Sequence, residues 1–416
     1  MRKIYAGLLF LFLFQFGFGQ DNLRTMFYNI FRYPTSTPAN REFILKNIFN
    51  SYKPDLFMVA ELQNETGANL ILNTALQTID NNYARSTFVH NTSNPTDTLQ
   101  QMVFFNTQKL VLYDEEVLQT TIRDINHITF QLKTPDIATN PTFLEVYVTH
   151  LKSSTGPANR QLRLDMVNVF LNSLNSLPAN RYVLFAGDFN IQNSTEDSYV
   201  AIINPANPIV MVDPINRPGR WTKDITFQDI HTQATRTSAV GFGIGGATGG
   251  IDDRFDFIMM SENFRTSTDF FYIPNTYKAF GNNGNCFDKR IDDASCTGDF
   301  SLSLRQNLHN MSDHTPVVMD LEISQTLLST VDFDKQVLIQ FASSNLVSDE
   351  LKLRIDLKQI YSSTELLIFN TLGQQIGRVR IGNQNEVTLH TQNLASGIYF
   401  IKLNTHPQEI LKFIRK

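Results

Sequence analysis

The chain has 416 residues, of which 42% are hydrophobic and 18% charged, and its formal net charge is −5. This length exceeds one small domain and the apolar content excludes a disordered protein, so we expect two folded units with short extra segments. Between Asp21 and Ser324, 23 Lys and Arg residues stand against 32 Asp and Glu residues, a net charge of about −9. Such a surface repels phosphate backbones, which excludes tight non-specific binding of nucleic acid but permits brief, metal-assisted contact.

Residues 1–20 have the pattern of a secretory signal peptide. Arg2 and Lys3 provide a positive start, and a nearly unbroken apolar run from Leu8 to Phe18 follows. The run is too short to span a bilayer comfortably, and no charged stop-transfer flank follows it. We therefore expect a cleaved signal, a secreted or cell-surface protein, and no stable insertion into a membrane.

Strands and helices alternate over residues 21–324. In chain order, the pattern predicts a strand over 25–30, a helix over 39–52, strands over 55–61, 102–105 and 143–151, a helix over 157–177, and strands over 182–186, 255–260 and 317–321. The long helix is amphipathic, and the strand over 55–61 is a continuous apolar run closed by a carboxylate. This order favours a layered α/β domain.

The composition changes near Ser324, where Ser, Thr and Gln cluster. We expect a linker over 325–332 and a small all-β unit over 333–416, with strands near 365–369, 387–389, 398–403 and 410–414. This unit has no His/Asp/Glu constellation of its own.

The only two cysteines, Cys286 and Cys296, lie close together in a loop rich in Gly, Asn and Asp. Two cysteines alone cannot make a structural zinc site, which needs four ligands. In an oxidising compartment a local disulfide is favoured over two unrelated thiols, and it would stabilise the loop by about 2–3 kcal/mol.

A glycine-rich segment over 241–246 formally matches the dinucleotide-binding fingerprint. That motif requires a strand before it and a helix after it. The residues that follow, 247–253, are also rich in glycine. We therefore reject a cofactor site and expect a mobile loop.

Polar residues stand beside or at the ends of several apolar strands. They are Asn29, Glu61, His150, Asp188, Asn190, Asp256, Asp313 and His314. Ionisable side chains beside buried strands are costly unless they converge on partners or a metal. Any one of them could be a cap, a turn residue or a hydrogen-bonded core histidine, but coincidence does not explain the whole set.

These positions, with Thr149–Ser153, Gly187–Asn190, Arg254–Asp256 and Ser312–Val317, occur in the order of the deoxyribonuclease-I-like, or endonuclease/exonuclease/phosphatase, superfamily. The chain resembles that family over residues 25–322. The resemblance implies an α/β fold in which two stacked, mostly antiparallel sheets are covered by helices, a four-layered α/β/β/α sandwich with the site at one edge. It also implies hydrolysis of phosphate esters with Mg²⁺, sometimes Mn²⁺ or Ca²⁺.

The resemblance assigns a metal-binding role to Glu61, helped by Asn29 and Asp313, because Mg²⁺ prefers such hard oxygen ligands. The ion would neutralise charge on the phosphoryl oxygens and the leaving group.

The other matching positions are expected to act on the reacting groups. Asp188 would orient or deprotonate the attacking water, and Asn190 would hold the phosphate or the nucleophile. His150 and His314 would donate to phosphoryl oxygens or protonate the leaving oxygen. Asp256 would orient an imidazole, by family analogy that of His314, and raise its pKa.

The substrate class is less well specified. The Thr149–Ser153 element resembles the nuclease side of the superfamily, and the residues around Asn190 and Arg254 lack the inositol-phosphatase pattern. Trp221, in a basic segment, could stack on a nucleic-acid strand or equally pack under a loop. The apolar segment over 270–272 could be a membrane-docking loop of the sphingomyelinase kind, although a strand fits it better.

We therefore expect a monomeric extracellular endonuclease that acts on DNA or RNA. The alternatives are a phospholipid phosphodiesterase and a non-catalytic surface binding protein on the same fold.

The C-terminal residues carry a second resemblance. The segments 367–374 and 394–401, followed by a basic end over 412–416, resemble the C-terminal sorting domain of the type IX secretion system. This implies a β-sandwich that the export machinery recognises and that can be removed after translocation. The alternative is a carbohydrate-binding or surface-binding β module.

Overall fold

The computed structural model describes residues 21–325 except 244, residue 327, residues 339–355 except 343, and residues 364–381, 385–404 and 410–416. The chain divides into two units, Met1–Ser329 and Thr330–Lys416. The predicted signal peptide and most of the predicted linker lie outside the described residues, so the domain boundaries stay predictions.

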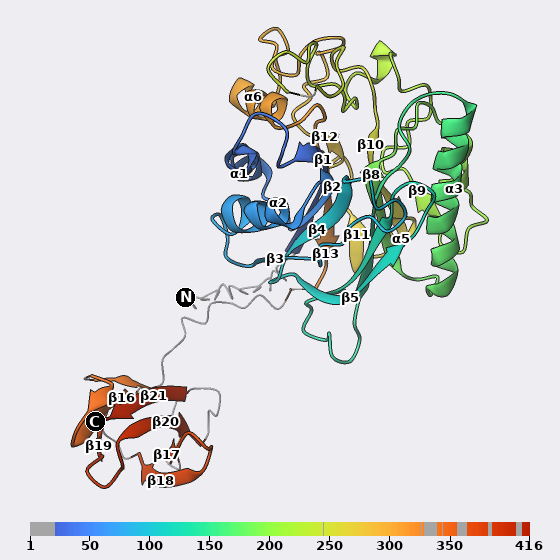
Figure 1. Ribbon diagram of the computed structural model, residues 1–416. Coiled ribbons are helices and arrows are strands. Elements are labelled where there is room, and N and C mark those ends of the chain that lie inside the picture. The colour runs from blue at the N-terminus through green and yellow to red at the C-terminus, as the bar shows by residue number, and fades with distance from the viewer. Residues whose placement is uncertain are drawn as a thin grey trace, which may run out of the picture. The chain divides into compact units, whose positions relative to one another are not determined.

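The first unit is built on two mixed sheets (Figure 1). The seven-stranded sheet has the order β11-β13-β1-β2-β4-β3, with β12 also beside β13. Its strands are β1 (Asp21–Tyr33), β2 (Leu56–Leu62), β3 (Tyr83–Arg85), β4 (Gln100–Asn106), β11 (Phe270–Tyr272), β12 (Lys278–Ala279) and β13 (Val317–Ile323). Only β1 and β2 run parallel; every other neighbouring pair is antiparallel.

The six-stranded sheet has the order β5-β6-β7-β8-β10-β9. Its strands are β5 (Leu110–Leu118), β6 (Ile125–Leu132), β7 (Phe143–His150), β8 (Tyr182–Asp188), β9 (Met211–Val212) and β10 (Asp256–Ser261). Here β7 and β8 form the one parallel pair. The hairpin β5–β6 was not predicted, because the edge strand β5 is mostly exposed and carries no clean apolar pattern.

Alternate residues of the strands point into different cores, as the period of a strand requires. Phe27 and Met58 of one sheet pack with Val146 and Leu184 of the other, so these residues fill the space between the sheets. Each such fully buried side chain contributes roughly 1.5–3 kcal/mol.

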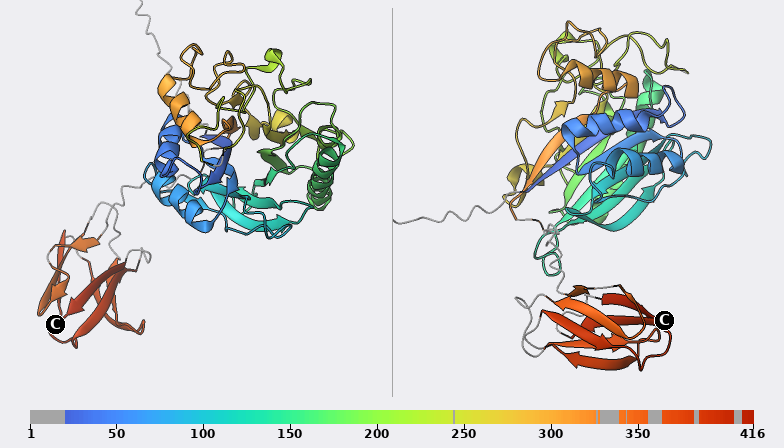
Figure 2. Two further views of the ribbon diagram at one scale, coloured as in Figure 1. Left: turned by 45° about the horizontal axis from the view of Figure 1, so that its top comes forward. Right: turned by 90° about the vertical axis from the view of Figure 1, so that its left-hand side faces the viewer.

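Helices cover the outer faces of both sheets (Figure 2). They are α1 (Arg41–Tyr52), α2 (Glu65–Leu70), η1 (Ile71–Leu76) and α6 (Leu302–Met311) on the seven-stranded sheet, and α3 (Pro157–Ser173), η2 (Leu174–Ser176) and α4 (Asp197–Ile202) on the six-stranded sheet. Short turns η3 (Ile225–Phe227) and α5 (Asn263–Thr266) lie in connections. The predicted four-layered α/β/β/α sandwich is confirmed.

The close approach of β7 and β8 depends on a glycine. Thr149 pairs with Gly187 in this parallel ladder. A Cβ added at Gly187 would lie 2.3 Å from the carbonyl oxygen of Thr149. Only glycine therefore allows these two strands to bring His150 and Asp188 to the same level.

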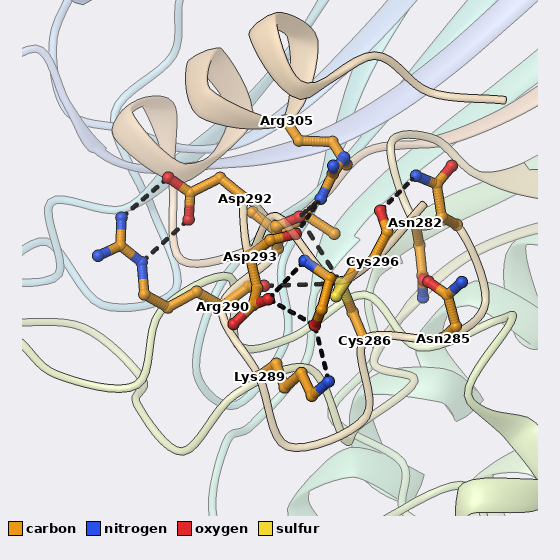
Figure 3. Close-up of a disulfide and its surroundings, with 12 residues drawn as sticks. Asn282, Asn285, Cys286, Lys289, Arg290, Asp292, Asp293, Cys296 and Arg305 are labelled. Carbon is orange, nitrogen blue, oxygen red and sulfur yellow. Dashed lines mark hydrogen bonds and ion pairs between the residues drawn. A yellow bond between two sulfur atoms is a disulfide. The ribbon is translucent and has the colours of Figure 1, made fainter. Parts of the chain in front are cut away.

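The predicted disulfide between Cys286 and Cys296 is present (Figure 3). Nη1 of Arg305, on α6, donates to the carbonyl oxygens of Ile291 and Asp293 inside the closed loop, at 2.7 and 2.9 Å. The amide of Ile291 in turn donates to the carbonyl of Thr235 at 3.0 Å. The bridged loop thus braces the segment around Thr235, which runs beside the site described below.

The second unit is all-β, as predicted. A three-stranded sheet has the order β14-β16-β19, and a five-stranded sheet has the order β15-β21-β20-β17-β18. The strands are β14 (Ile339–Phe341), β15 (Leu346–Val347), β16 (Glu350–Ile355), β17 (Glu365–Phe369), β18 (Gln375–Arg380), β19 (Glu386–His390), β20 (Gly397–Leu403) and β21 (Ile410–Arg415). Both sheets contribute to one core, which includes Leu351, Leu353, Ile401 and Phe413.

Among the described residues, no helix is long and apolar enough to cross a membrane.

Candidate active site

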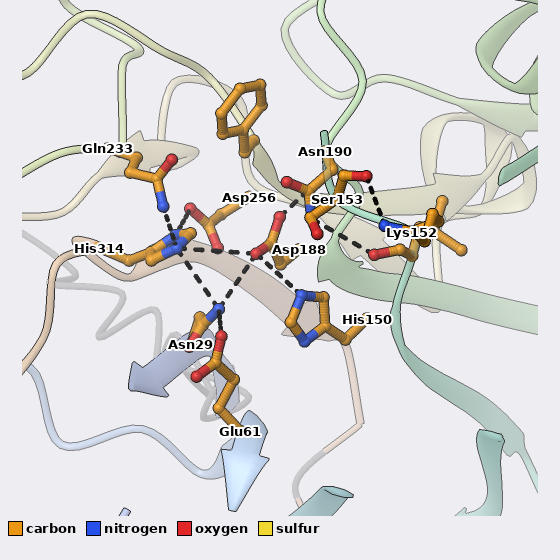
Figure 4. Close-up of polar contacts among 12 residues, drawn as sticks. Asn29, Glu61, His150, Lys152, Ser153, Asp188, Asn190, Gln233, Asp256 and His314 are labelled. Atoms are coloured by element: carbon orange, nitrogen blue, oxygen red, sulfur yellow. Dashed lines mark hydrogen bonds and ion pairs between the residues drawn. The ribbon is translucent and has the colours of Figure 1, made fainter. Parts of the chain in front are cut away.

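All eight polar residues selected from the sequence lie at one edge of the sandwich, and Figure 4 labels all of them except Asp313. The seven-stranded sheet supplies Asn29 and Glu61 from the parallel strands β1 and β2, and Asp313 and His314 just before β13. The six-stranded sheet supplies His150 and Asp188 at the ends of β7 and β8, Asn190 just beyond, and Asp256 at the start of β10.

Asn29 links the two sheets. Its Nδ2 donates to Oε1 of Glu61 and to Oδ2 of Asp188, both at 3.1 Å. Its Oδ1 accepts from the amide of Phe31, and Ser312 Oγ donates to its carbonyl oxygen at 2.6 Å. The side chain is fully buried and held on every side, so it fixes the separation of the two carboxylates.

His314 forms an ion pair with Asp256, in which Nδ1 lies 2.7 Å from Oδ2. Its Nε2 contacts Nε2 of Gln233 at 2.5 Å and lies 3.7 Å from Oδ2 of Asp188. Burial alone would lower the pKa of His314, but the carboxylates of Asp256 and Asp188 raise it well above its usual value. These carboxylates therefore favour the protonated form of the imidazole.

His150 has the opposite tendency. Its Nε2 lies 3.4 Å from Oδ2 of Asp188. Burial, with the positive charges of Arg123 and His314 nearby, lowers the pKa of His150 well below its usual value. The pKa values of the two imidazoles beside Asp188 are therefore shifted in opposite directions.

The carboxyl groups at the centre are destabilised as anions. Burial raises the pKa of Asp188 to about 7, and the negative charges of Asp256 and Glu61 add to the effect. Burial and the charge of Asp313 likewise raise the pKa of Glu61. Buried carboxyl groups with shifted pKa values in one cavity are typical of functional sites.

The backbone is strained where the chain turns through the site. Phe31, Arg32, Glu61 and Asn190 all have positive φ, from 41° to 63°. Such conformations are costly for residues other than glycine and persist where the surroundings fix them. For Asn190 the fixing contacts are its amide to Oδ1 of Asp188 at 3.2 Å and its Nδ2 to the carbonyl of Leu151 at 3.4 Å.

The end of the glycine-rich segment over 241–246 lies against Asp313. The amide of Ala247 donates to Oδ2 of Asp313 at 2.6 Å, and a Cβ at Gly246 would lie 2.9 Å from the same oxygen. The chain after this segment forms bends and two bridge residues, Ile251 and Asp253, where the dinucleotide fingerprint requires a helix. The guanidinium of Arg236 stacks 3.6 Å from the ring centre of Phe242 and donates to the carbonyl of Gly245.

Six of the selected residues line a cavity of about 390 Å³: Glu61, His150, Asp188, Asn190, Asp313 and His314. Asn29 and Asp256 do not line it but are hydrogen-bonded to residues that do. A larger hollow of about 660 Å³, beside Tyr272 and Asn282, contains none of the eight.

Lining residues outside the elements selected from the sequence are Phe31, Arg32, Leu99, Arg123, Ser154, Gln192, Gln233 and Ala247. Gln233 contacts His314, and Arg123 donates to the carbonyl of His150 at 3.3 Å and pairs with Asp97 at 2.8 Å. Both lie outside the regular strands and follow no periodic pattern. The selected residues stand within or a few positions from the ends of apolar strands, and Gln233 and Arg123 carried no comparable signal.

The donor set fits a hard divalent cation. Ligand atoms of Asp188, Asp256 and His314 lie within 4.8 Å of one another, but the ion pair between His314 and Asp256 leaves Glu61, Asn29 and Asp313 as the oxygen ligands for a cation. Oδ1 of Asp256 is buried with no hydrogen-bond partner in the described part of the chain, so the site holds more carboxylate oxygen than its protein partners satisfy. Together with Glu61 and Asp313, the cavity has an excess of buried negative charge that a cation would neutralise.

Two features considered for substrate binding take structural roles. Trp221 is fully buried against Tyr199 and Phe257, and its Nε1 donates to the carbonyl of Arg217 at 2.8 Å. Of the two interpretations left open for Trp221, packing under the loop is therefore confirmed. Phe270–Tyr272 forms strand β11 against β13, with Phe270 buried, so the interpretation as a strand, which the sequence favoured over a membrane-docking loop, is also confirmed.

Comparison with solved structures finds similar chains at low sequence identity. The human Nocturnin catalytic domain with bound sulfate is 15% identical with a TM-score of 0.45, over 73% of this chain and 97% of that chain. D. rerio TDP2 complexed with single-strand DNA product is 14% identical with a TM-score of 0.46, over 72% and 98%. An endonuclease/exonuclease/phosphatase family protein from Bacteroides thetaiotaomicron is 13% identical with a TM-score of 0.42, over 73% and 99%.

No curated protein matches the sequence. Residues 347–416 match the family model described as a secretion system C-terminal sorting domain. The predicted sorting domain is therefore confirmed over this segment. The last 70 residues of the chain identify it as a secreted or cell-surface protein that carries a type IX secretion sorting domain.

Proposed function

We propose that this protein is a secreted, metal-dependent phosphodiesterase, and specifically an extracellular endonuclease that hydrolyses DNA or RNA. The observation that carries the proposal is the convergence in one cavity of buried carboxyl groups and two histidines with opposite pKa shifts. Side chains whose pKa values are shifted in opposite directions around one point are suited to accept one proton and to donate another during a single reaction.

The reaction that fits is in-line attack of water on phosphorus. As the water oxygen bonds to phosphorus, Asp188 accepts its proton; a carboxyl group with a pKa of about 7 is a suitable base near neutral pH. The ester P–O bond breaks on the opposite side, and the protonated His314 supplies a proton to the leaving oxygen. His150, kept neutral, donates an N–H to a phosphoryl oxygen, and Asn190 holds the phosphate in line.

Mg²⁺, or in its place Mn²⁺ or Ca²⁺, would supply positive charge to the phosphoryl oxygens and the leaving group. Glu61, Asn29 and Asp313 would hold the ion. Burial and the charge of Asp313 raise the pKa of Glu61, which means that they destabilise its ionised form. A cation bound beside Glu61 would stabilise the ionised form, and this supports the assignment.

A phosphodiester in a nucleic acid is preferred over one in a lipid because the segment considered for membrane docking is not a free loop. Arg32 lines the cavity and offers positive charge to a phosphate of either kind, whereas Arg123, which also lines it, is paired with Asp97. The segment that motivated a phospholipid substrate, Phe270–Tyr272, is a paired strand.

The test is cleavage of plasmid DNA and of RNA by the purified protein. We expect cleavage with Mg²⁺ that a chelator abolishes, and a rate roughly 10²–10⁴-fold lower in His314→Ala. His90→Ala, at an exposed histidine that does not line the cavity, is the matched control and should retain full activity. Cleavage of sphingomyelin without cleavage of nucleic acid would instead establish a phospholipid phosphodiesterase. No hydrolysis of any phosphodiester would leave a non-catalytic binding protein.

A further inference from the structure

The two sheets of the C-terminal unit present very different outer faces. In each sheet, alternate residues point into the shared core, and the others point away from it. Pairing registers show which outward residues of neighbouring strands lie side by side. The composition of each outer face can therefore be read directly from the strand pairing.

The outer face of the three-stranded sheet is polar, and several of its charges are paired. Its members are Gln340, Glu350, Lys352, Arg354, Glu386, Thr388 and His390, all exposed. Arg354 pairs with Glu386 at 3.4 Å, and His390 lies 3.5 Å from Glu350. This is the ordinary face of a sheet turned to water.

The outer face of the five-stranded sheet carries a row of aliphatic side chains. Leu346 of β15 is paired with Ile414 of β21, which is paired with Ile398 of β20. Their side chains are 44%, 37% and 37% exposed. On the same face lie Phe400 and Phe369, which are paired and half-buried, and Ile410, which is 58% exposed. A contiguous apolar surface of this kind on a small unit marks an interaction site.

Cations without acidic partners border this row. Lys412 is paired with Phe400, Lys402 with Ile410, and Arg378 with Leu367, so all three side chains share the apolar face. Within the described residues none of the three forms an ion pair, and Lys402 instead lies 4.6 Å from the ring centre of Phe369. The face therefore combines an apolar centre with a mostly positive border, in which Glu365, opposite Arg380, is the one acidic residue of the paired strands.

We propose that this apolar and basic face, defined by Leu346, Ile398, Phe400, Ile410 and Ile414 with Arg378, Lys402 and Lys412, is the surface by which the export machinery recognises the chain. Its partner is an acidic protein surface with an apolar centre. The match of residues 347–416 to a sorting domain indicates that this unit is recognised during export, and charge complementarity selects this face over the paired, polar one.

The experiment measures export of the full chain in a host with a type IX secretion system. One variant removes the apolar row with Ile398→Thr and Ile414→Thr, which retain β-branched residues in the strands. A second reverses the charges with Lys402→Glu and Lys412→Glu. The matched control makes the same change in charge on the other sheet, with Lys352→Glu and Arg354→Glu.

Both test variants should reduce the fraction of protein reaching the medium or cell surface by about tenfold or more, as loss of one or two anchoring contacts implies. The control should stay within about twofold of the unaltered chain. Equal thermal unfolding temperatures for all purified chains would show that the loss is not a failure to fold.

Three results would overturn the proposal. Normal export of both test variants would show that the face is not recognised, and an equal loss in the control would show that only net charge matters. The third result is that the face binds another partner. The protein would then bind vesicles of phosphatidylglycerol or self-associate with increasing concentration, and the test variants would abolish that binding while export is unchanged.

Discussion

The pair formed by His314 and Asp256 sets the charge state of the site. The contact of 2.7 Å, in a place where both side chains are almost completely buried, opposes the tendency of burial to neutralise the imidazole. In the proposed reaction Asp256 would therefore act through His314 and not on the substrate.

Asp256→Asn should keep the shape of the site while removing this charge. We expect kcat to fall about 10²–10⁴-fold, because His314 loses its proton more readily and its orientation is less fixed. Steady-state kinetics with DNA, together with NMR titration of the His314 ring, measure both effects. Asp269→Asn, at an exposed aspartate, is the control. A rate loss without a lower pKa of His314 would contradict this explanation.

A second histidine, His231, should make the protein sensitive to acid. It is fully buried, and burial lowers its pKa to about 4. The unfolded chain, in which histidine has a pKa near 6.5, binds the proton more readily, so stability is complete above pH 6.5 and is lost as the pH falls towards 4.

Because His231 is buried, the free energy of unfolding should fall by about 2–3 kcal/mol between pH 6.5 and pH 4. In urea titrations at pH 7 and pH 4.5, the unaltered protein should lose more free energy of unfolding than His231→Gln does. The comparison uses the difference between the two pH values within each protein, so an overall change in stability does not affect it. An identical difference in both proteins would refute the prediction.

At the scale of elements, the disulfide loop supports the site indirectly. Asn282, just before the bridged loop, donates to the carbonyl of His231 at 2.9 Å, and the amide of Ile291, within it, donates to that of Thr235. The segment between these two contacts carries Gln233, which meets His314.

Replacing both cysteines, with Cys286→Ser and Cys296→Ser, should lower the free energy of unfolding by about 2–3 kcal/mol, since the closed loop is short. It should also weaken catalysis, because the segment that carries Gln233 becomes less fixed. Denaturant titration and kinetics of the double variant measure the two effects, and reduction of the unaltered protein should reproduce them. Unchanged stability on reduction would rule out the bracing role.

The strands that carry the site were accessible from sequence for a physical reason. A buried strand is an apolar run, and a polar residue at its end, such as Glu61 or Asp188, is conspicuous because its burial needs a partner. Gln233 and Arg123 were not accessible, since they lie in connections whose position depends on contacts far away in sequence. Helix α6 was also missed, although Ser301 caps it by accepting from the amide of Leu304.

At the scale of the whole molecule, the division into two units separates the candidate active site from the sorting domain. The cavity lies entirely in the first unit, while the sorting-domain match lies entirely in the second. The second unit has its own core of aliphatic and aromatic residues.

Deletion of residues 333–416 should therefore leave hydrolysis of phosphodiesters within about twofold of the full chain, because no cavity residue is removed. The same deletion should retain the protein in the periplasm. Activity assays on the purified truncated chain and fractionation of an expressing culture test the two halves separately. Normal secretion of the truncated chain would show that the C-terminal unit is not the export signal.

The link that Asn29 makes between the sheets has a consequence for how the enzyme would fail. Glu61 and Asp188 belong to different sheets, and their spacing depends on two hydrogen bonds from one amide. A small sliding of one sheet over the other would separate the reacting groups before any strand melted. Activity would therefore depend on the alignment of the two sheets. Heat or denaturant should abolish hydrolysis under conditions in which the circular dichroism of the protein is still that of the native state.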